Sequence, residues 1–346
     1  MSAYDPKATS AGWVHCGRLN QLRGAEMRRR KFITLLGGAS AGWPLAAQAQ
    51  QPTMPRVGAL ILGNADAQSF GAELREGLRS GGFVEGQNVQ YDFRSADGDI
   101  ALLPKLAAEL VALKVNVIVA LYTPCSLAAK QATREIPIVT VSGDPVELGL
   151  VASLGRPGGN ITGISMIAVE LHGKCLELFR DALPGIRRVA VLGNATDPFS
   201  KPFLEQLRLV GKATGIETPQ TLVRTPAEID GAFAGMKKEG AGGVVVQGSL
   251  ASKTAAELAL KHRLPAATIT RAFAEAGALM TYGADELDLF RRCAVVVAKI
   301  LQGAKPAELP VEQPTKFELV INLKTAKALD LKIAESFLLR ANTIIE

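Results

Sequence analysis

The sequence has 346 residues, which is enough for two domains of ordinary size. Its net charge of +6 comes almost wholly from residues 1–49, which carry seven basic and two acidic residues. The rest of the chain is nearly neutral, so the basic balance does not indicate a nucleic-acid-binding protein. The composition is that of a globular protein, which excludes an intrinsically disordered chain.

Residues 1–49 are predicted to be a leader with an export signal. A basic run over residues 28–31 precedes a mildly apolar stretch over residues 32–47, and Ala47-Gln48-Ala49 is typical of a cleavage site. The Arg-Arg-Lys-Phe-Ile pattern resembles a twin-arginine signal, so we expect export to the periplasm and cleavage after Ala49. An uncleaved anchor is the alternative, although the apolar stretch is short for a membrane span. We expect Met27 to be the natural start.

Beyond residue 49, predicted strands and helices alternate along the chain. Apolar runs such as residues 55–62 and 115–121 are typical of buried parallel strands, and amphipathic helical stretches follow them. The alternation restarts after Ser165, so we predict an α/β protein of two doubly wound parallel-sheet lobes with a hinge and an interlobe cleft. The predicted boundaries are residues 55–162 plus 283–314 for lobe 1, and residues 163–282 plus 315–346 for lobe 2.

The most informative stretch runs from Ile136 to Ser165. Residues 136–141 are predicted to form a buried strand that breaks at residues 142–145, and residues 146–154 are predicted to form a short apolar helix. Ligands of open α/β sheets bind outside the carboxyl ends of strands, so the break is predicted to belong to a ligand site. After a Gly/Pro turn, residues 160–165 are predicted to lead from one lobe to the other.

Cysteine and histidine usage limits the chemistry that is open to the chain. Cys125, Cys175 and Cys293 are an odd number at wide spacing, which predicts neither a disulfide framework nor a metal site. Only His172 and His262 follow the leader, so a zinc site or a Ser–His–Asp triad is not expected. No G-x-G-x-x-G follows the first strand, and we expect no cofactor.

Several ordered segments carry a resemblance to a known family. They are RRRKFITLLGG at residues 28–38, EGQNV at 85–89, GDPV at 143–146 with GLV at 149–151, RPGGNITG at 156–163, and LPVEQPTKFELVINLKTAKALDL at 309–331. The chain resembles the tryptophan/tyrosine-type ABC substrate-binding family, which implies a type I periplasmic binding protein fold. It also implies the periplasmic solute-binding component of an ABC importer, which presents a small amino-acid-like or carboxylate ligand to a permease in the inner membrane.

The ends of three predicted lobe 1 strands are expected to converge on the ligand. A helix follows each of them, and helix N-termini favour a ligand carboxylate. Asp144 is the predicted partner of a ligand ammonium group, and Tyr122 is predicted to stack on an apolar or aromatic ligand. The expected site residues are Asn64, Ser69, Tyr122, Thr123, Ser126, Asp144 and Pro145 in lobe 1, with Ser165, Asn194, Gly248, Ser249 and Tyr282 from lobe 2.

Four of these residues have a structural alternative. Asp144 and Ser249 can cap helices, Tyr122 can belong to the core, and Asn194 can be a turn residue. These alternatives stay open from the sequence alone.

We expect a monomeric receptor that makes and breaks no bond and has no nucleic-acid partner. One alternative is a ligand-sensing periplasmic receptor that acts through a separate signalling partner. A less favoured alternative is a cysteine-dependent enzyme on the same frame, with Cys125 at a helix N-terminus as its nucleophile.

Overall fold

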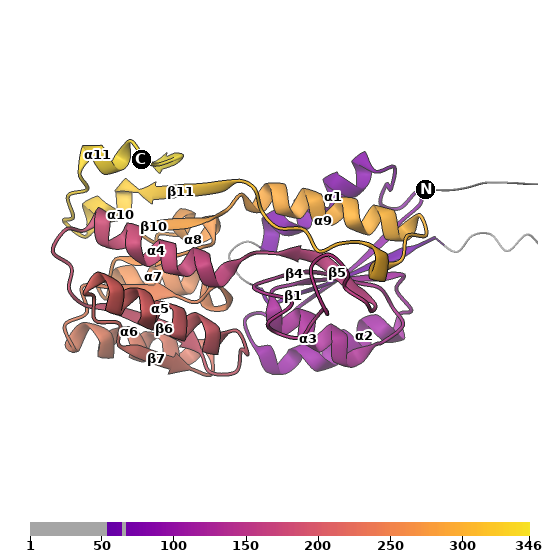
Figure 1. The fold of residues 1–346 in the computed structure, drawn as a ribbon, viewed down its shortest axis with the longest axis horizontal. Coiled ribbons are helices and arrows are strands. Elements are labelled where there is room, and N and C mark those ends of the chain that lie inside the picture. The colour runs from indigo at the N-terminus through magenta and orange to yellow at the C-terminus, as the bar shows by residue number, and fades with distance from the viewer. Residues whose placement is uncertain (1–53, 64–66) are drawn as a thin grey trace, which may run out of the picture. The chain divides into compact units, whose positions relative to one another are not determined.

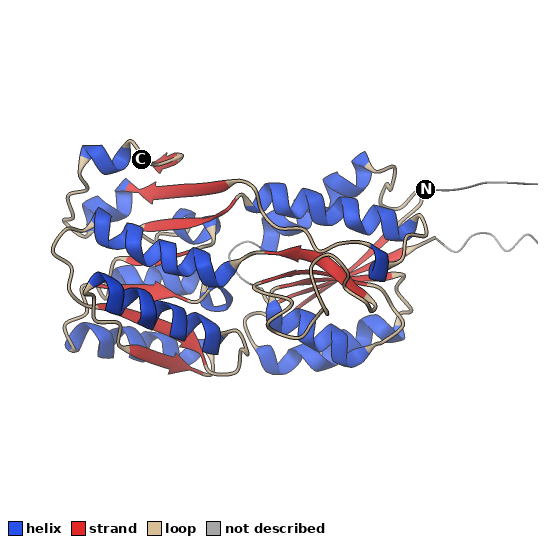
Figure 2. Ribbon diagram, in the orientation of Figure 1, coloured by secondary structure: helices blue, strands red, loops and turns tan. Residues whose placement is uncertain are grey.

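The computed structural model describes residues 54–63 and 67–346, which belong to one compact unit. Two sheets, each with helices packed on it, make up this part of the chain (Figures 1 and 2). The predicted leader and Asn64 lie outside the described residues. Among the helices that are described, none combines the length and the apolar composition that a bilayer span requires.

The first sheet is parallel throughout and forms lobe 1. Its elements are β1 (Arg56–Ile61), α1 (Ala67–Ser80), β2 (Gln90–Ser95), η1 (Ile100–Leu102), α2 (Leu103–Ala112), β3 (Val117–Leu121), α3 (Thr123–Ala132), β4 (Ile138–Ser142), β5 (Ile161–Ser165), α9 (Glu286–Leu301) and η4 (Pro306–Glu308). The strand order is β2-β1-β3-β4-β5. All residues of β3, β4 and β5 are buried, because α1 and α9 cover one face and α2 and α3 the other (Figure 1).

The second sheet forms lobe 2 and is parallel except for one pair. Its elements are α4 (Ala168–Ala182), β6 (Val189–Asn194), α5 (Ser200–Thr214), β7 (Gln220–Val223), η2 (Pro226–Glu228), α6 (Ile229–Lys238), β8 (Gly243–Val246), η3 (Gly248–Leu250), α7 (Lys253–Lys261), β9 (Ala266–Thr268), α8 (Arg271–Glu275), β10 (Met280–Ala284), β11 (Phe317–Asn322), α10 (Leu323–Ala328), α11 (Glu335–Leu338) and β12 (Thr343–Ile345). The strand order is β12-β11-β10-β9-β8-β6-β7, and β10 pairs with β11 in the antiparallel direction.

The described chain passes between the two sheets three times. It leaves lobe 1 after β5, returns after β10 to form α9, and leaves again before β11. On its last passage the backbone lies beside β5, where the Glu312 N–H donates to the Gly163 carbonyl at 2.9 Å. Because β5 holds residues 163–165 in the first sheet, the first crossing follows Ser165, three residues beyond the predicted boundary.

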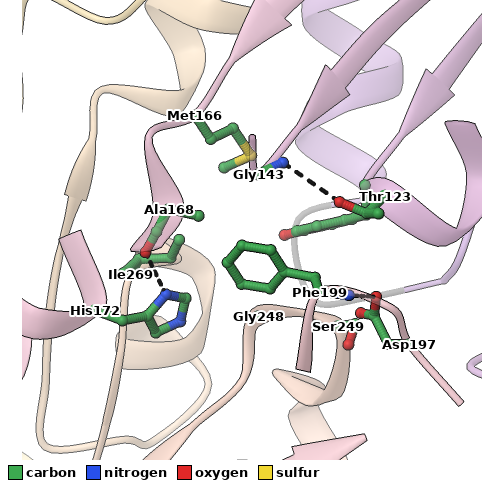
Figure 3. Close-up of a pocket in the computed structure, with 11 residues that line it drawn as sticks. Thr123, Gly143, Met166, Ala168, His172, Asp197, Phe199, Gly248, Ser249 and Ile269 are labelled. Carbon is green, nitrogen blue, oxygen red and sulfur yellow. Dashed lines mark hydrogen bonds between the residues drawn. The ribbon is translucent and has the colours of Figure 1, made fainter. Parts of the chain in front are cut away.

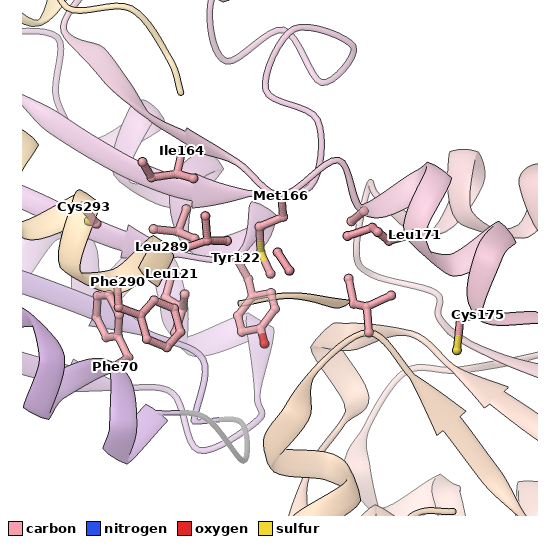
Figure 4. Packing of buried hydrophobic residues seen from close by; sticks show 14 of the residues in the cluster. Phe70, Leu121, Tyr122, Ile164, Met166, Leu171, Cys175, Leu289, Phe290 and Cys293 are labelled. Atoms are coloured by element: carbon pink, nitrogen blue, oxygen red, sulfur yellow. The ribbon is translucent and has the colours of Figure 1, made fainter. Parts of the chain in front are cut away.

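One hydrophobic cluster extends from lobe 1 into lobe 2 (Figure 4). Phe70 on α1 meets Phe290 on α9 edge to face, with ring centroids 5.1 Å apart, and this contact holds α9 in lobe 1. Met166, in the connection after β5, continues the cluster toward Leu171 and Cys175 on α4. The first crossing is therefore packed into the core on both sides.

The helix predicted for residues 146–154 is wrong. The segment forms successive turns, with Leu150 N–H donating to the Pro145 carbonyl at 2.8 Å. Gly149 adopts a φ of +64°, which ends the first turn before a helix can propagate. The apolar side chains of Leu150 and Val151 are buried all the same. The apolar residues on which the helix prediction rested therefore mark a buried segment and not a helix.

Gly163→Ala is expected to lower the free energy of unfolding by roughly 3 kcal/mol. The backbone at Gly163 has a φ of +140°, and an added Cβ would overlap the carbonyl oxygen of Thr140 on β4. Denaturant unfolding measures the effect. Gly159→Ala is the matched control from the same motif, because an added Cβ meets nothing within 4 Å there. Equal stability of the two variants would contradict this account of β5.

Candidate functional site

A pocket lies where strand ends of the two lobes meet (Figure 3). Lobe 1 supplies residues that follow β3 and β4, and lobe 2 supplies the loops after β6, β8 and β9 and the start of α4. The cavity is small, with a volume of about 20 Å³, which is room for roughly one water molecule and lies well below the range for small-molecule sites. The lining residues are Tyr122, Thr123, Gly143, Met166, Ala168, His172, Asp197, Phe199, Gly248, Ser249 and Ile269.

Tyr122 enters the pocket from the end of β3 with a strained backbone. It precedes α3 with φ 73° and ψ 159°, a conformation that almost only glycine adopts and that costs roughly 1–3 kcal/mol. Its side chain is buried, and its hydroxyl lies 3.3 Å from the hydroxyl of Thr270 in lobe 2. The strained residue thus places an aromatic ring at the contact between the lobes.

Two glycines allow the lobes to approach each other across the pocket. At Gly143 in lobe 1, an added Cβ would lie 2.6 Å from the ring of Phe199 in lobe 2. At Gly248 in lobe 2, an added Cβ would lie 3.6 Å from the ring of Tyr122, which is ordinary contact. The closer approach is therefore the one between Phe199 and the backbone of Gly143.

Asp197 is the acidic side chain of the pocket. It lies in the loop after β6 and is only 4% exposed. Its Oδ1 accepts from the Phe199 N–H at 3.0 Å, and its Oδ2 accepts from Nε2 of Gln247 at 2.7 Å. Burial raises the pKa of this carboxyl above its ordinary value, against hydrogen bonds from Ser249, Phe199 and Gln247 that favour the charged form. No cationic side chain within the described residues forms an ion pair with it.

Gln247 holds the Asp197 carboxylate in place. Its Oε1 accepts from the Asn194 N–H at 2.9 Å and from the Ser200 hydroxyl at 2.7 Å. The amide oxygen therefore already accepts two hydrogen bonds, and the amide nitrogen points toward Asp197 and the Ser249 hydroxyl. Neighbouring strands β6 and β8 carry this network, so the carboxylate is fixed by the sheet of lobe 2.

Four predicted site residues line this pocket: Tyr122, Thr123, Gly248 and Ser249. Ser69 lies at a different cavity, which acidic residues and Arg271 line. The remaining predicted residues that the structure describes are outside the pocket lining. They are Ser126, Asp144, Pro145, Ser165, Asn194 and Tyr282.

Most of these six residues have local partners. Asp144 Oδ1 accepts from the Val146 and Glu147 N–H groups, so it closes the turn after β4. Asn194 Oδ1 accepts from Thr196, which is the turn role that the sequence left open. The hydroxyl groups of Ser126 and Ser165 donate to the carbonyl oxygens of Tyr122 and Gly143, Tyr282 stacks on Phe317, and Pro145 is buried.

Sequence reasoning missed Asp197, Phe199, His172 and Met166. A signal for Asp197 was present, because Asp197-Pro198 follows a lobe 2 strand as Asp144-Pro145 follows a lobe 1 strand. The two dipeptides differ in the burial of their aspartates, since Asp197 is buried and Asp144 is partly exposed at a turn.

Cys125, Cys175 and Cys293, the cysteines of the part of the chain that the structure describes, are all buried. Burial raises the pKa of the Cys175 and Cys293 thiols to about 12. Cys125 lies on α3 and is not among the residues that line the pocket. No group of metal-ligating side chains is found among the described residues.

A family model described as ABC transporter substrate binding protein matches residues 63–345. The chain belongs to this family. This confirms the predicted family resemblance and the role as the solute-binding component of an ABC transporter. Proteins of the family bind solutes for transport.

Individual relatives agree with this membership. A tyrosine-binding protein of Clostridioides difficile (strain R20291) is 29% identical over 260 residues, which is 74% of each chain. A conserved domain protein from Vibrio cholerae is 27% identical, with a TM-score of 0.77, over 84% of this chain and 99% of that chain. A Streptococcus pneumoniae ABC domain, solved with L-Trp, has the same TM-score and coverage at 24% identity. These structures confirm the predicted two-lobed α/β fold.

Proposed function

We propose that this ABC substrate-binding protein binds an α-amino acid with an apolar aromatic side chain between its lobes. The buried carboxylate of Asp197 carries the proposal. A charge that is removed from water without a partner is costly, and the ammonium group of an amino acid supplies the missing partner with a charge-assisted hydrogen bond. The tyrosine-binding relative is consistent with this class of ligand.

The opposite side of the pocket suits the rest of an amino acid. α3 begins at Thr123, and the N-terminus of this ten-residue helix directs partial positive charge toward a ligand carboxylate. Met166, Phe199 and Ile269 form apolar walls that suit an aromatic ring. The ligand carboxylate would then contact lobe 1 while the ammonium group contacts lobe 2.

Binding to both lobes would favour the closed form, which a membrane permease would recognise. We propose that the protein works in the periplasm as a monomer, after export by the twin-arginine-like signal. It delivers its ligand without chemical change.

Asp197→Asn is expected to weaken binding of L-tyrosine by roughly a hundredfold, because the ammonium group loses its charged partner. Titration calorimetry measures the affinity, and thermal unfolding of the ligand-free variant checks its fold. Asp144→Asn is the matched control, with an expected change of less than about threefold, because this carboxylate closes a turn outside the pocket. The reverse order of effects would show that Asp144 is the anchor and that our assignment is wrong.

The affinity for L-tyrosine is expected to fall on acidification. The ammonium group binds the ionised Asp197, so affinity is constant above the carboxyl pKa and falls about tenfold per pH unit below it. Since burial raises that pKa, the fall begins at a higher pH than it would for an exposed aspartate. Calorimetry between pH 8 and pH 4.5 tests this, and the weak binding that Asp197→Asn retains should not show the same slope.

Gly143→Ala is expected to weaken L-tyrosine binding by roughly tenfold or more, because the new methyl group would meet the Phe199 ring and hold the lobes apart. Gly248→Ala is the matched control with an expected change below about threefold, because its Cβ has room against Tyr122. Phe199→Ala in the Gly143→Ala background tests the cause. If the binding free energy that the double variant loses equals the sum of the losses in the two single variants, Gly143 and Phe199 are not coupled, which would contradict this explanation.

A further inference from the structure

His172 is a buried polar side chain in the pocket that the charge argument does not use. It lies in the second turn of α4 with no exposed surface and lines the pocket. Its ring meets Phe203 edge to face at a centroid distance of 4.7 Å and lies 6.0 Å from Phe199. The ring is therefore held firmly among aromatic neighbours on α5 and in the loop before it.

The hydrogen bond of Nδ1 fixes the tautomer. Nδ1 lies 2.6 Å from the carbonyl oxygen of Ala168, which can only accept, so Nδ1 carries the proton. Burial lowers the pKa of His172 to about 4, and the imidazole is neutral at pH 7. Nε2 therefore presents a lone pair and acts as a hydrogen-bond acceptor.

Nε2 has no hydrogen-bond partner within the described part of the chain. A buried acceptor without a donor carries a desolvation cost that a donor at the right place removes. The atom belongs to a residue that lines the pocket, so a ligand can supply that donor.

We propose that Nε2 of His172 accepts a hydrogen bond from a donor on the ligand's aromatic side chain. The pocket then selects a phenol O–H or an indole N–H over a plain phenyl ring. The inference rests on the proposed function, since it concerns the side chain of the proposed amino acid. His172 is thus a specificity-determining residue.

The side-chain donor suits this position better than the ammonium group. Asp197 and His172 lie on different sides of Phe199 (Figure 3), with the Asp197 carboxylate bonded to the Phe199 backbone. A cation gains far more beside the carboxylate than beside a neutral imidazole. The ammonium group therefore goes to Asp197, and the second donor of the ligand remains for Nε2.

The test compares L-tyrosine, L-tryptophan and L-phenylalanine by titration calorimetry on the full chain. The wild-type protein is expected to bind tyrosine or tryptophan at least about tenfold more tightly than phenylalanine. His172→Phe keeps an aromatic ring against Phe203 but removes the acceptor, and is expected to erase this preference while phenylalanine binding changes little. His172→Gln keeps an acceptor and is expected to retain part of the preference.

His262→Gln is the control for loss of a histidine, because His262 bonds Asp230 and is not among the residues that line the pocket. It is expected to leave all three affinities unchanged. A preference that survives in His172→Phe overturns the inference, as does a wild-type protein that binds all three equally. In the latter case tight, Asp197-dependent binding would leave the proposed function standing. Binding of none of the three would overturn both. If His172→Phe does not fold, the wild-type preference and its retention in His172→Gln decide.

Discussion

The buried carboxylate of Asp197 is the constraint around which the pocket is arranged. Its two oxygens are bound by the Phe199 backbone and by Gln247, and Gln247 is itself held by Asn194 and Ser200. All of these donors are neutral, so they orient the charge without cancelling it. Burial then disfavours ionisation, which the raised pKa expresses. The carboxyl group is therefore oriented before a ligand binds. Once ionised, it forms a stronger hydrogen bond with a cationic group than with a neutral one.

The Asp197 carboxylate attracts a ligand cation strongly only when the space between the lobes is too narrow to hold bulk water. Water in an open cleft would solvate the carboxylate and weaken its attraction for a ligand. Phe199 approaches Gly143 closely and Tyr122 contacts Thr270, so the two lobes touch at two places beside the pocket. Tyr122 reaches its place only through a backbone conformation that other packing must stabilise. The connection that carries the first crossing also contains a left-handed residue, Ile167 with φ 44°, so both strained positions lie where the lobes meet.

The fold could be predicted from the sequence because buried parallel strands and amphipathic helices leave strong patterns. The strand-end rule also pointed to Tyr122, Thr123, Gly248 and Ser249, which line the pocket, since the positions of strand ends follow from topology alone. The rule led to Asp144-Pro145 after β4 and passed over Asp197-Pro198, the same dipeptide after β6, which holds a different position in its sheet. The two aspartates differ in their burial and in the hydrogen bond from Gln247, which is fifty residues away from Asp197 in the chain. Neither difference can be read from the sequence around the dipeptides. The place of His172 in the pocket could not be predicted either, because its ring packs against Phe199 and Phe203, which come from other parts of the chain.

The proposed arrangement explains why a zwitterion, and not a simple amine, would drive closure. A ligand shifts the balance between open and closed forms only by binding the closed form more tightly. An amine could satisfy Asp197, which belongs entirely to lobe 2, and would gain little from lobe 1. A ligand that also carries a carboxylate gains from the N-terminus of α3 only when the lobes are together. The two charges of an amino acid therefore connect the lobes, and the aromatic ring between them adds burial that is complete only in the closed form.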